Sequence, residues 1–306
     1  MMRIDDVRRR PVLRRRRYWS AVVYLSLWLC AFSAVAVSVG VFVVLLSQSS
    51  EFFSHVSVHE FLFTATWTPV FEQPRYGILP LLSATLWVAG IAMLLAIPLG
   101  MMLAVYLSEF APHRLREIIK PVLELLESVP SIVFGYFALM LLTPLAQHVF
   151  PSLGTYNLLV PGVVIGIMLL PYIVTVSEDA MHAIPQEIRE GAYSVGMSRW
   201  QTAYKVIIPG AASGIMAAII LALSRALGET MVVTIAAGQS SLLITDPRDG
   251  GTTITAYIMQ MSLGDLPQGG LSYHTIFAAG LALFLLTFLF NVLGALVKKR
   301  VKAAYE

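Results

Sequence analysis

The chain has 306 residues, of which 57% are hydrophobic and 13% are charged, with a mean hydropathy of +0.75 and a formal net charge of +3. A soluble domain carries about twice this share of charged residues, so the composition excludes a soluble globular enzyme. Cys30 is the single cysteine, which excludes an internal disulfide. We therefore expect an all-α integral membrane protein.

Six apolar runs are long enough to cross a membrane, since a spanning helix needs about 20 mostly apolar residues. The third and fourth runs contain Pro130, Pro161 and Pro171, which membrane helices tolerate when neighbouring groups satisfy the freed carbonyls. The fifth run is too long for one straight span and is expected to bend or protrude. The six predicted spans are 19–46, 78–107, 122–145, 158–176, 208–237 and 276–297.

The distribution of basic residues predicts the orientation of these spans. Of the 21 Lys and Arg residues, 18 lie in the N-terminal tail, the second and fourth connecting loops and the C-terminal tail. The opposite loops carry only Arg75 and Arg248, so the positive-inside rule places both termini in the cytoplasm. We divide the chain into a basic tail (1–18), a transmembrane permease domain (19–297) and a second basic tail (298–306).

The charge of the tails indicates topology, and we expect no nucleic-acid partner. Residues 14–17 are all arginine and could also contact anionic lipid headgroups. The outer side is predicted to hold two loops, an aromatic-rich one over 47–77 and a Gly-, Ser- and Thr-rich one over 239–272.

Motifs for catalysis are missing from the sequence. It contains no G-x-x-x-x-G-K-[ST] phosphate loop, no Cys/His metal cluster and no G-x-S-x-G elbow. We predict no catalytic residue, no metal site and no cofactor in this chain, so that a partner or an ion gradient must supply energy for any uphill transport.

A polar, helix-forming block interrupts the apolar runs on the predicted cytoplasmic side, within a loop over about 178–209. Pro185 suits a helix start, and Glu187 and Glu190 are favourable in the first turns. Gly196 can turn the chain before a second helical stretch. The block therefore predicts two short helices at an angle, although a plain solvated loop is the alternative.

The spacing within this block resembles the EAA signature of ABC importer permeases. The order is Glu-x-Ala, three residues, Gly, nine residues and aliphatic-x-aliphatic-Pro, with mild departures at Gly191, Val206 and Ile208. The resemblance implies a type I ABC importer permease fold whose coupling helix fits a cleft on an ATP-binding subunit. The residues implied in this coupling are Glu190, Gly191, Ala192, Gly196 and Pro209.

Further blocks resemble phosphate importer permeases, and within them the PstC-type subunit. They are 67–71 (WTPVF), 129–135 (VPSIVFG), 177–180 (SEDA) and 225–231 (RALGETM). The resemblance implies a bacterial plasma (inner) membrane location and a set of partners. These are a second, PstA-like permease, a dimer of ATP-binding subunits that bind ATP and Mg, and an extracytoplasmic phosphate-binding protein.

Arg225 lies inside the fifth run, where a charged side chain costs about 2.5–3.5 kcal/mol on insertion scales and must face a polar interior or a partner. Its guanidinium fork suits a tetrahedral oxyanion. Glu229 is four residues on and is expected to share the helix face of Arg225. An internal ion pair that only fixes helix packing is the alternative. The resemblance adds Thr230 and Ser131 to the substrate path.

The sequence thus predicts the permease subunit of an ATP-driven inorganic phosphate importer that works by alternating access. A permease for sulfate or molybdate, a secondary anion transporter without an ATPase, and a membrane sensor remain as alternatives. Whatever co-purifies with the chain would distinguish them.

Overall fold

Six helical segments among the described residues are long and apolar enough to cross a membrane, which confirms the predicted number of spans. The computed structural model describes residues 4–264, 267 and 269–305. Its spanning segments are Trp19–His55, Leu79–Phe110, Ser131–Val149, Leu159–His182, Arg199–Gly228 and Leu271–Arg300.

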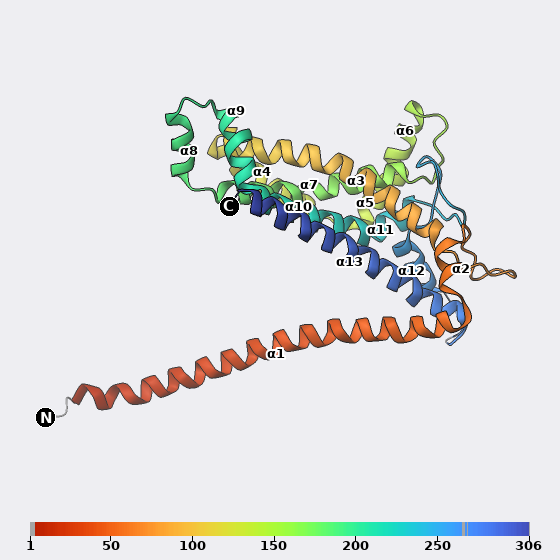
Figure 1. Cartoon of the computed structure of the whole chain (residues 1–306), viewed down its shortest axis with the longest axis horizontal. Coiled ribbons are helices and arrows are strands. Elements are labelled where there is room, and N and C mark those ends of the chain that lie inside the picture. Colours follow the sequence, from red (N-terminus) through yellow and green to blue (C-terminus); the bar gives the residue numbers. More distant parts are fainter. Residues whose placement is uncertain (1–3, 265–266, 268, 306) are drawn as a thin grey trace.

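These spans and the shorter helices between them follow one another as shown in Figure 1. The elements are α1 (Ile4–His55), α2 (Val58–Phe63), α3 (Leu79–Val105), the π-helical turn η1 (Tyr106–Phe110), α4 (His113–Ser128), α5 (Ser131–Phe137), η2 (Ala138–Leu142), α6 (Thr143–Val149), α7 (Leu159–His182), α8 (Gln186–Ser194), α9 (Arg199–Thr202), η3 (Ala203–Ile207), α10 (Ile208–Gly228), α11 (Met231–Ala236), α12 (Ile254–Leu263) and α13 (Leu271–Tyr305).

The third span begins later than the sequence predicted. The predicted run over 122–145 joins the end of α4 to α5, but the chain leaves helical geometry at Val129 and Pro130. Proline disfavours helical backbone in the residue before it, so the break falls there. Helix α4 is amphipathic and precedes the span, which starts at Ser131.

The centre of the bundle is the pair α3 and α7. Two glycines four residues apart on α7 allow close approach: a Cβ on Gly162 would lie 2.8 Å from the Ile91 Cβ, and one on Gly166 would lie 2.9 Å from the Ala92 carbonyl oxygen. Small residues at this spacing let membrane helices pack at short distance. The pair forms one unit, against which α10 and α11 also pack.

Helix α1 contacts α13 near its outer end and diverges from it toward the N-terminus (Figure 1). The Phe42 and Phe284 rings lie 5.1 Å apart, whereas the helix residues from 19 to 44 are all exposed. Its apolar surface is therefore unpaired within the single chain.

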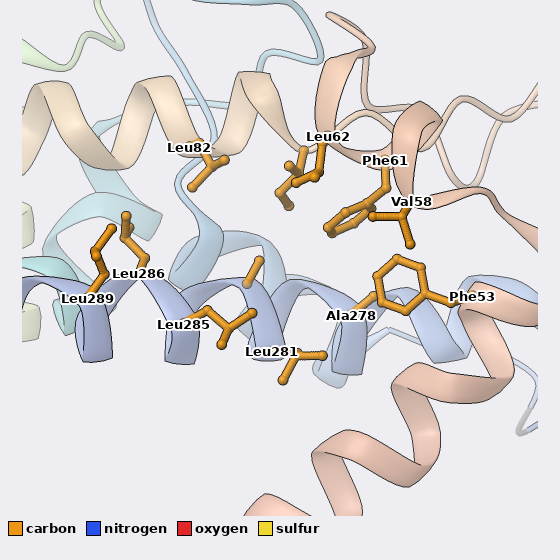
Figure 2. Close-up of a pocket in the computed structure, with 12 residues that line it drawn as sticks. Phe53, Val58, Phe61, Leu62, Leu82, Ala278, Leu281, Leu285, Leu286 and Leu289 are labelled. Atoms are coloured by element: carbon orange, nitrogen blue, oxygen red, sulfur yellow. The ribbon is translucent and has the colours of Figure 1, made fainter.

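At the outer end of the bundle, buried aromatic side chains pack into one cluster that includes Phe52, Phe61, Trp67 and Tyr257. Beside it, an apolar groove of about 430 Å³ lies between α2, α3 and α13 (Figure 2). None of the predicted site residues lines this groove. The outer loops also contain two helices, α2 and α12, that the sequence did not predict.

Candidate coupling loop and transport path

The predicted two-helix block is present at one end of the bundle, on the side where the C-terminus lies (Figure 1). Helix α8 follows Pro185, and α9 begins after Ser198, whose side chain and that of Gln201 form a reciprocal capping box. Between them Gly196 has φ +82°, a left-handed conformation that favours glycine. The prediction of two short helices separated by a turn at Gly196 is confirmed.

The predicted coupling residues occupy different surroundings within this block. Glu190, Gly191 and Gly196 are exposed, and a Cβ at either glycine would meet no atom within 4 Å. Ala192 is buried, and Pro209 lies in the first turn of α10. The exposed members are thus available to a cytoplasmic partner, while Ala192 and Pro209 belong to the packing of the loop and the span.

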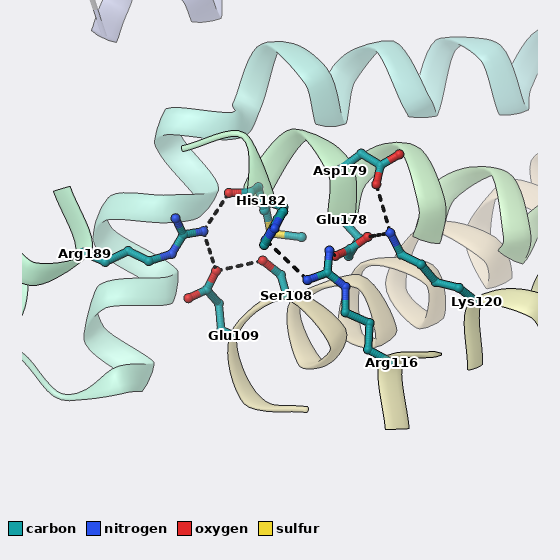
Figure 3. A network of polar contacts seen from close by, with 9 residues as sticks. Ser108, Glu109, Arg116, Lys120, Glu178, Asp179, His182 and Arg189 are labelled. Atoms are coloured by element: carbon teal, nitrogen blue, oxygen red, sulfur yellow. Dashed lines mark hydrogen bonds and ion pairs between the residues drawn. The ribbon is translucent and has the colours of Figure 1, made fainter. Parts of the chain in front are cut away.

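Arg189, directly before Glu190, is the buried anchor of α8. Its Nη2 donates to the Met181 carbonyl at 2.8 Å and to Glu109 Oε1 at 3.1 Å (Figure 3). Its Nη1 donates to the Ile184 carbonyl. Ser108 Oγ also donates to Glu109 Oε1 at 2.7 Å. The guanidinium therefore joins α8 to the end of α7 and to η1.

A second ion cluster lies beside the first and ties α4 to α7 (Figure 3). The Glu178 side chain is fully buried and forms ion pairs with Arg116 and Lys120. Lys120 also contacts Asp179 at 3.0 Å. Burial acts to lower the pKa of Lys120, but the hydrogen bonds and charges of Glu178 and Asp179 outweigh it and raise that pKa.

Arg225 and Glu229 do not form the helical pair that the sequence suggested. Helix α10 ends at Gly228, and Glu229 has extended backbone (φ −65°, ψ 130°), so the two side chains no longer share a helix face. The structure records no ion pair between these two described residues. The expectation of a shared helix face is wrong, because the helix stops before Glu229 is reached, and the alternative of an internal ion pair has no contact to support it among the described residues.

Instead, each of the two side chains has its own arrangement. Arg225 is exposed, and its guanidinium carbon lies 4.7 Å from the centre of the Tyr172 ring. Glu229 Oε1 accepts the main-chain N–H groups of Met231 at 3.1 Å and Val232 at 3.4 Å. The carboxylate thus caps α11, and no ion pair is recorded between Arg225 and a carboxylate among the residues that the structure describes.

The break at Glu229 is fixed from a distant part of the chain. Thr255 Oγ1, at the start of α12, donates to the Glu229 carbonyl at 2.7 Å. Thr230 is half-buried beside the break, and Thr234 Oγ1 donates to its carbonyl. The outer loop that carries Thr255 therefore helps to hold the bend in the fifth span.

Ser131 lies at the start of α5, where it is half-buried. Helix α5 packs against α11, and a Cβ on Gly135 would lie 2.9 Å from Ile235 Cδ1. The two interrupted helices thus meet through the segments that follow their breaks. This places the Ser131 and Arg225 regions in neighbouring parts of the bundle.

Sequence reasoning missed the roles of Arg189, Glu109, Glu178, Tyr172 and Thr255. In the sequence, Arg189 is one of several basic residues in a cytoplasmic loop. Glu109 is an acid at the end of an apolar run, which signals a need for a basic partner. The two residues are 80 positions apart along the chain, and one sequence cannot show such a contact.

The chain has the fold of ABC importer permeases. It matches a solved bacterial ABC transporter involved in import of the acidic polysaccharide alginate, with a TM-score of 0.63 over 93% of this chain and 99% of that one, at 15% identity. The match to an inward-facing MetNI methionine ABC transporter has a TM-score of 0.57 over 72% and 96%, at 17% identity.

Residues 96–303 match the family described as binding-protein-dependent transport system inner membrane component, and the chain belongs to this family. It is 35% identical to a probable ABC transporter permease protein YqgH of Bacillus subtilis, over 89% of both chains. It is 34% identical to the phosphate transport system permease protein PstC of Mesorhizobium japonicum, over 79% of both. For PstC of Haemophilus influenzae the identity is also 34%, over 78% of this chain and 80% of that protein. The chain is therefore a multi-pass membrane component of a transport system.

Proposed function

We propose that this chain is the permease subunit of an ATP-driven inorganic phosphate importer and forms half of its translocation path. The similarity to PstC proteins supports the substrate. The observation that carries the proposal is the state of Arg225, a cation within a spanning segment that contacts an aromatic ring and is exposed to the outside of the single chain.

Such an arginine suits an anion that passes along the exposed face. Stacking on Tyr172 orients the plane of the guanidinium but leaves its N–H groups free to donate. A tetrahedral oxyanion can accept two of these parallel donors, in a charge-assisted pair stronger than a neutral hydrogen bond. Thr230 and Ser131 supply hydroxyl groups in the same region of the bundle.

The exposed cytoplasmic face of α8 and α9 fits the role of a coupling surface. We propose that a dimer of ATP-binding subunits docks there through Glu190, Gly191 and the turn at Gly196, and that ATP and Mg bind to that dimer. The remaining partners in the proposal are a second permease of similar fold, PstA-like, and an external phosphate-binding protein. The chain itself performs no chemical step.

The test is to isolate the transporter through a tag on this chain and to reconstitute it in proteoliposomes with its binding protein. We expect an ATPase and a second permease to co-purify, and labelled phosphate to be taken up only with ATP and Mg. Uptake of sulfate in place of phosphate would assign another oxyanion. Flux without any ATPase would identify a secondary transporter, and partner binding without flux would identify a sensor.

A further inference from the structure

Arg189 differs from the exposed residues of the coupling loop because it is buried and points toward Glu109 and the end of α7. Its neighbours Ile188 and Glu190 are exposed on the same short helix, whereas Arg189 retains only 8% of its surface. A buried arginine is costly unless its donors are satisfied. Here the N–H donors of Arg189 are satisfied by groups outside α8, so the side chain connects this helix to its neighbours.

The three acceptors of Arg189 lie at or just beyond the ends of two spans. The Met181 carbonyl belongs to the last turn of α7, and the Ile184 carbonyl belongs to the short link that follows this helix. Glu109, whose side chain is 5% exposed, belongs to η1 at the end of the span that contains α3. One planar fork thus contacts both members of the central helix pair.

The backbone of α8 packs mainly against α9 and η3. Within the part of the chain that the structure describes, Arg189 supplies every hydrogen bond and ion pair recorded between α8 and the elements α7 and η1. Besides the short chain connection over 183–185 and the packing against η3, this side chain is the recorded polar link through which a displacement of α8 can reach these spans. Because α3 and α7 pack closely through Gly162 and Gly166, a pull on their ends would move them together.

We propose that Arg189 is a positioning residue that transmits displacement of α8 to the α3–α7 pair. This rests on the proposed function, in which α8 moves with an ATP-binding subunit. Lysine cannot replace the arginine fully, because an ammonium group lacks the fork that reaches two carbonyls and a carboxylate at once. Glu109 fixes the orientation of the fork from the side of α3.

The functional test compares Arg189→Met and Arg189→Lys in the complete transporter isolated through this chain. We expect ATP hydrolysis to persist in Arg189→Met while phosphate uptake per ATP falls about tenfold, within the usual range of coupling between sites. Arg189→Lys should lose less than Arg189→Met. Lys120→Gln is the matched control, since it removes a cation from the neighbouring cluster; it should lower thermal stability and leave the uptake-to-hydrolysis ratio unchanged.

A ratio equal to that of the wild type in Arg189→Met would overturn the inference, and so would an equal loss in Lys120→Gln. If Arg189→Met does not assemble with its partner subunits, Glu109→Gln is used in its place. This substitution keeps the shape of the side chain that Arg189 contacts and removes its charge. A reduced ratio in Glu109→Gln supports transmission through the pair, and an unchanged ratio contradicts it.

A distance measurement separates this inference from the identity of the substrate. Spin labels are placed at Ser194 on α8 and Met102 on α3, both exposed, in a Cys30→Ser background. With Arg189 present, the distance between the labels should stay the same with and without ATP, since the two helices move as one body. In Arg189→Met it should change or broaden. A distance that is constant in both proteins would refute transmission even if the transported anion were not phosphate.

Discussion

Two arginines of this chain show how the same side chain can serve two different purposes. Arg189 is buried, and its donors are taken by two carbonyls and Glu109 of the same chain. Arg225 is exposed, and it rests on the ring of Tyr172. The first arrangement is complete within the chain and suits mechanical connection. The second leaves donors for something outside the chain, which suits binding of an anion.

The comparison predicts that substitutions at the two sites will be seen in different measurements. Variants near Arg225 should alter which anion is carried and how fast. Variants in the α8–α9 loop should alter how much is carried per ATP. Each measurement below tests this division, beginning with the largest expected effect.

Arg225→Lys should reduce phosphate uptake by about 10–100-fold, which corresponds to the loss of a charge-assisted hydrogen bond worth about 1.5–3 kcal/mol. The charge remains, but the planar pair of donors is lost. Uptake of labelled phosphate by the reconstituted transporter measures the effect, and co-purification of partners measures assembly. Arg75→Lys, the same exchange in an outer loop, should leave uptake unchanged. Full uptake in Arg225→Lys would instead favour a role in packing alone.

Gly196→Val should lower uptake per ATP several-fold. The positive φ of Gly196 is unfavourable to a β-branched residue by about 1–2 kcal/mol, so the turn would adopt another geometry and change the angle between α8 and α9. The ratio of phosphate uptake to ATP hydrolysis measures this. Gly269→Val is the matched control, since Gly269 also has positive φ (+84°) with no atom near its Cβ position. Equal effects of the two substitutions would show a general loss of stability and count against coupling at Gly196.

Glu229→Gln should decrease the preference for phosphate over sulfate by about three- to tenfold, the range of one hydrogen bond. The amide oxygen can still accept from Met231 and Val232, so the cap on α11 is kept. The amide nitrogen, however, replaces an oxygen that could accept a hydrogen bond from the protonated oxygen of phosphate. Sulfate carries no such proton at neutral pH. Competition between the two labelled anions measures the preference. If rate and preference both stay at wild-type values, Glu229 serves only as the cap.

Much of this architecture could be predicted from local sequence. Hydropathy predicted the six spans, and proline, glycine and spacing predicted the α8–α9 loop with its turn at Gly196. These features depend on residues close together in the chain. The predicted start of the third span was wrong because Val122, Leu123 and the two leucines at 125 and 126 are apolar and adjoin the span in sequence. They belong to the amphipathic α4, which ends before Pro130.

The contacts within the site were less predictable, because they depend on where helices stop and which helices meet. Four-residue spacing pairs Arg225 with Glu229 only on a continuous helix, and α10 ends between them. Tyr172 and Thr255 contact this region from α7 and α12, at distances along the chain that no local pattern encodes. The same is true of Arg189 and Glu109.

The pH dependence of the Glu178 cluster should give the smallest effect. The pKa of Lys120 is raised in the folded protein, because Glu178 and Asp179 outweigh the opposing effect of burial. A raised pKa means that the stabilisation is fully present below the unfolded value of about 10.4 and is lost as the pH rises through the higher folded value. The thermal midpoint of the wild type should therefore exceed that of Lys120→Gln at pH 8, and the difference should narrow above about pH 10.5. A difference that stays constant to higher pH would show that the lysine contributes through its hydrocarbon stem and not through its charge, and that the cluster at this end is held by Arg116.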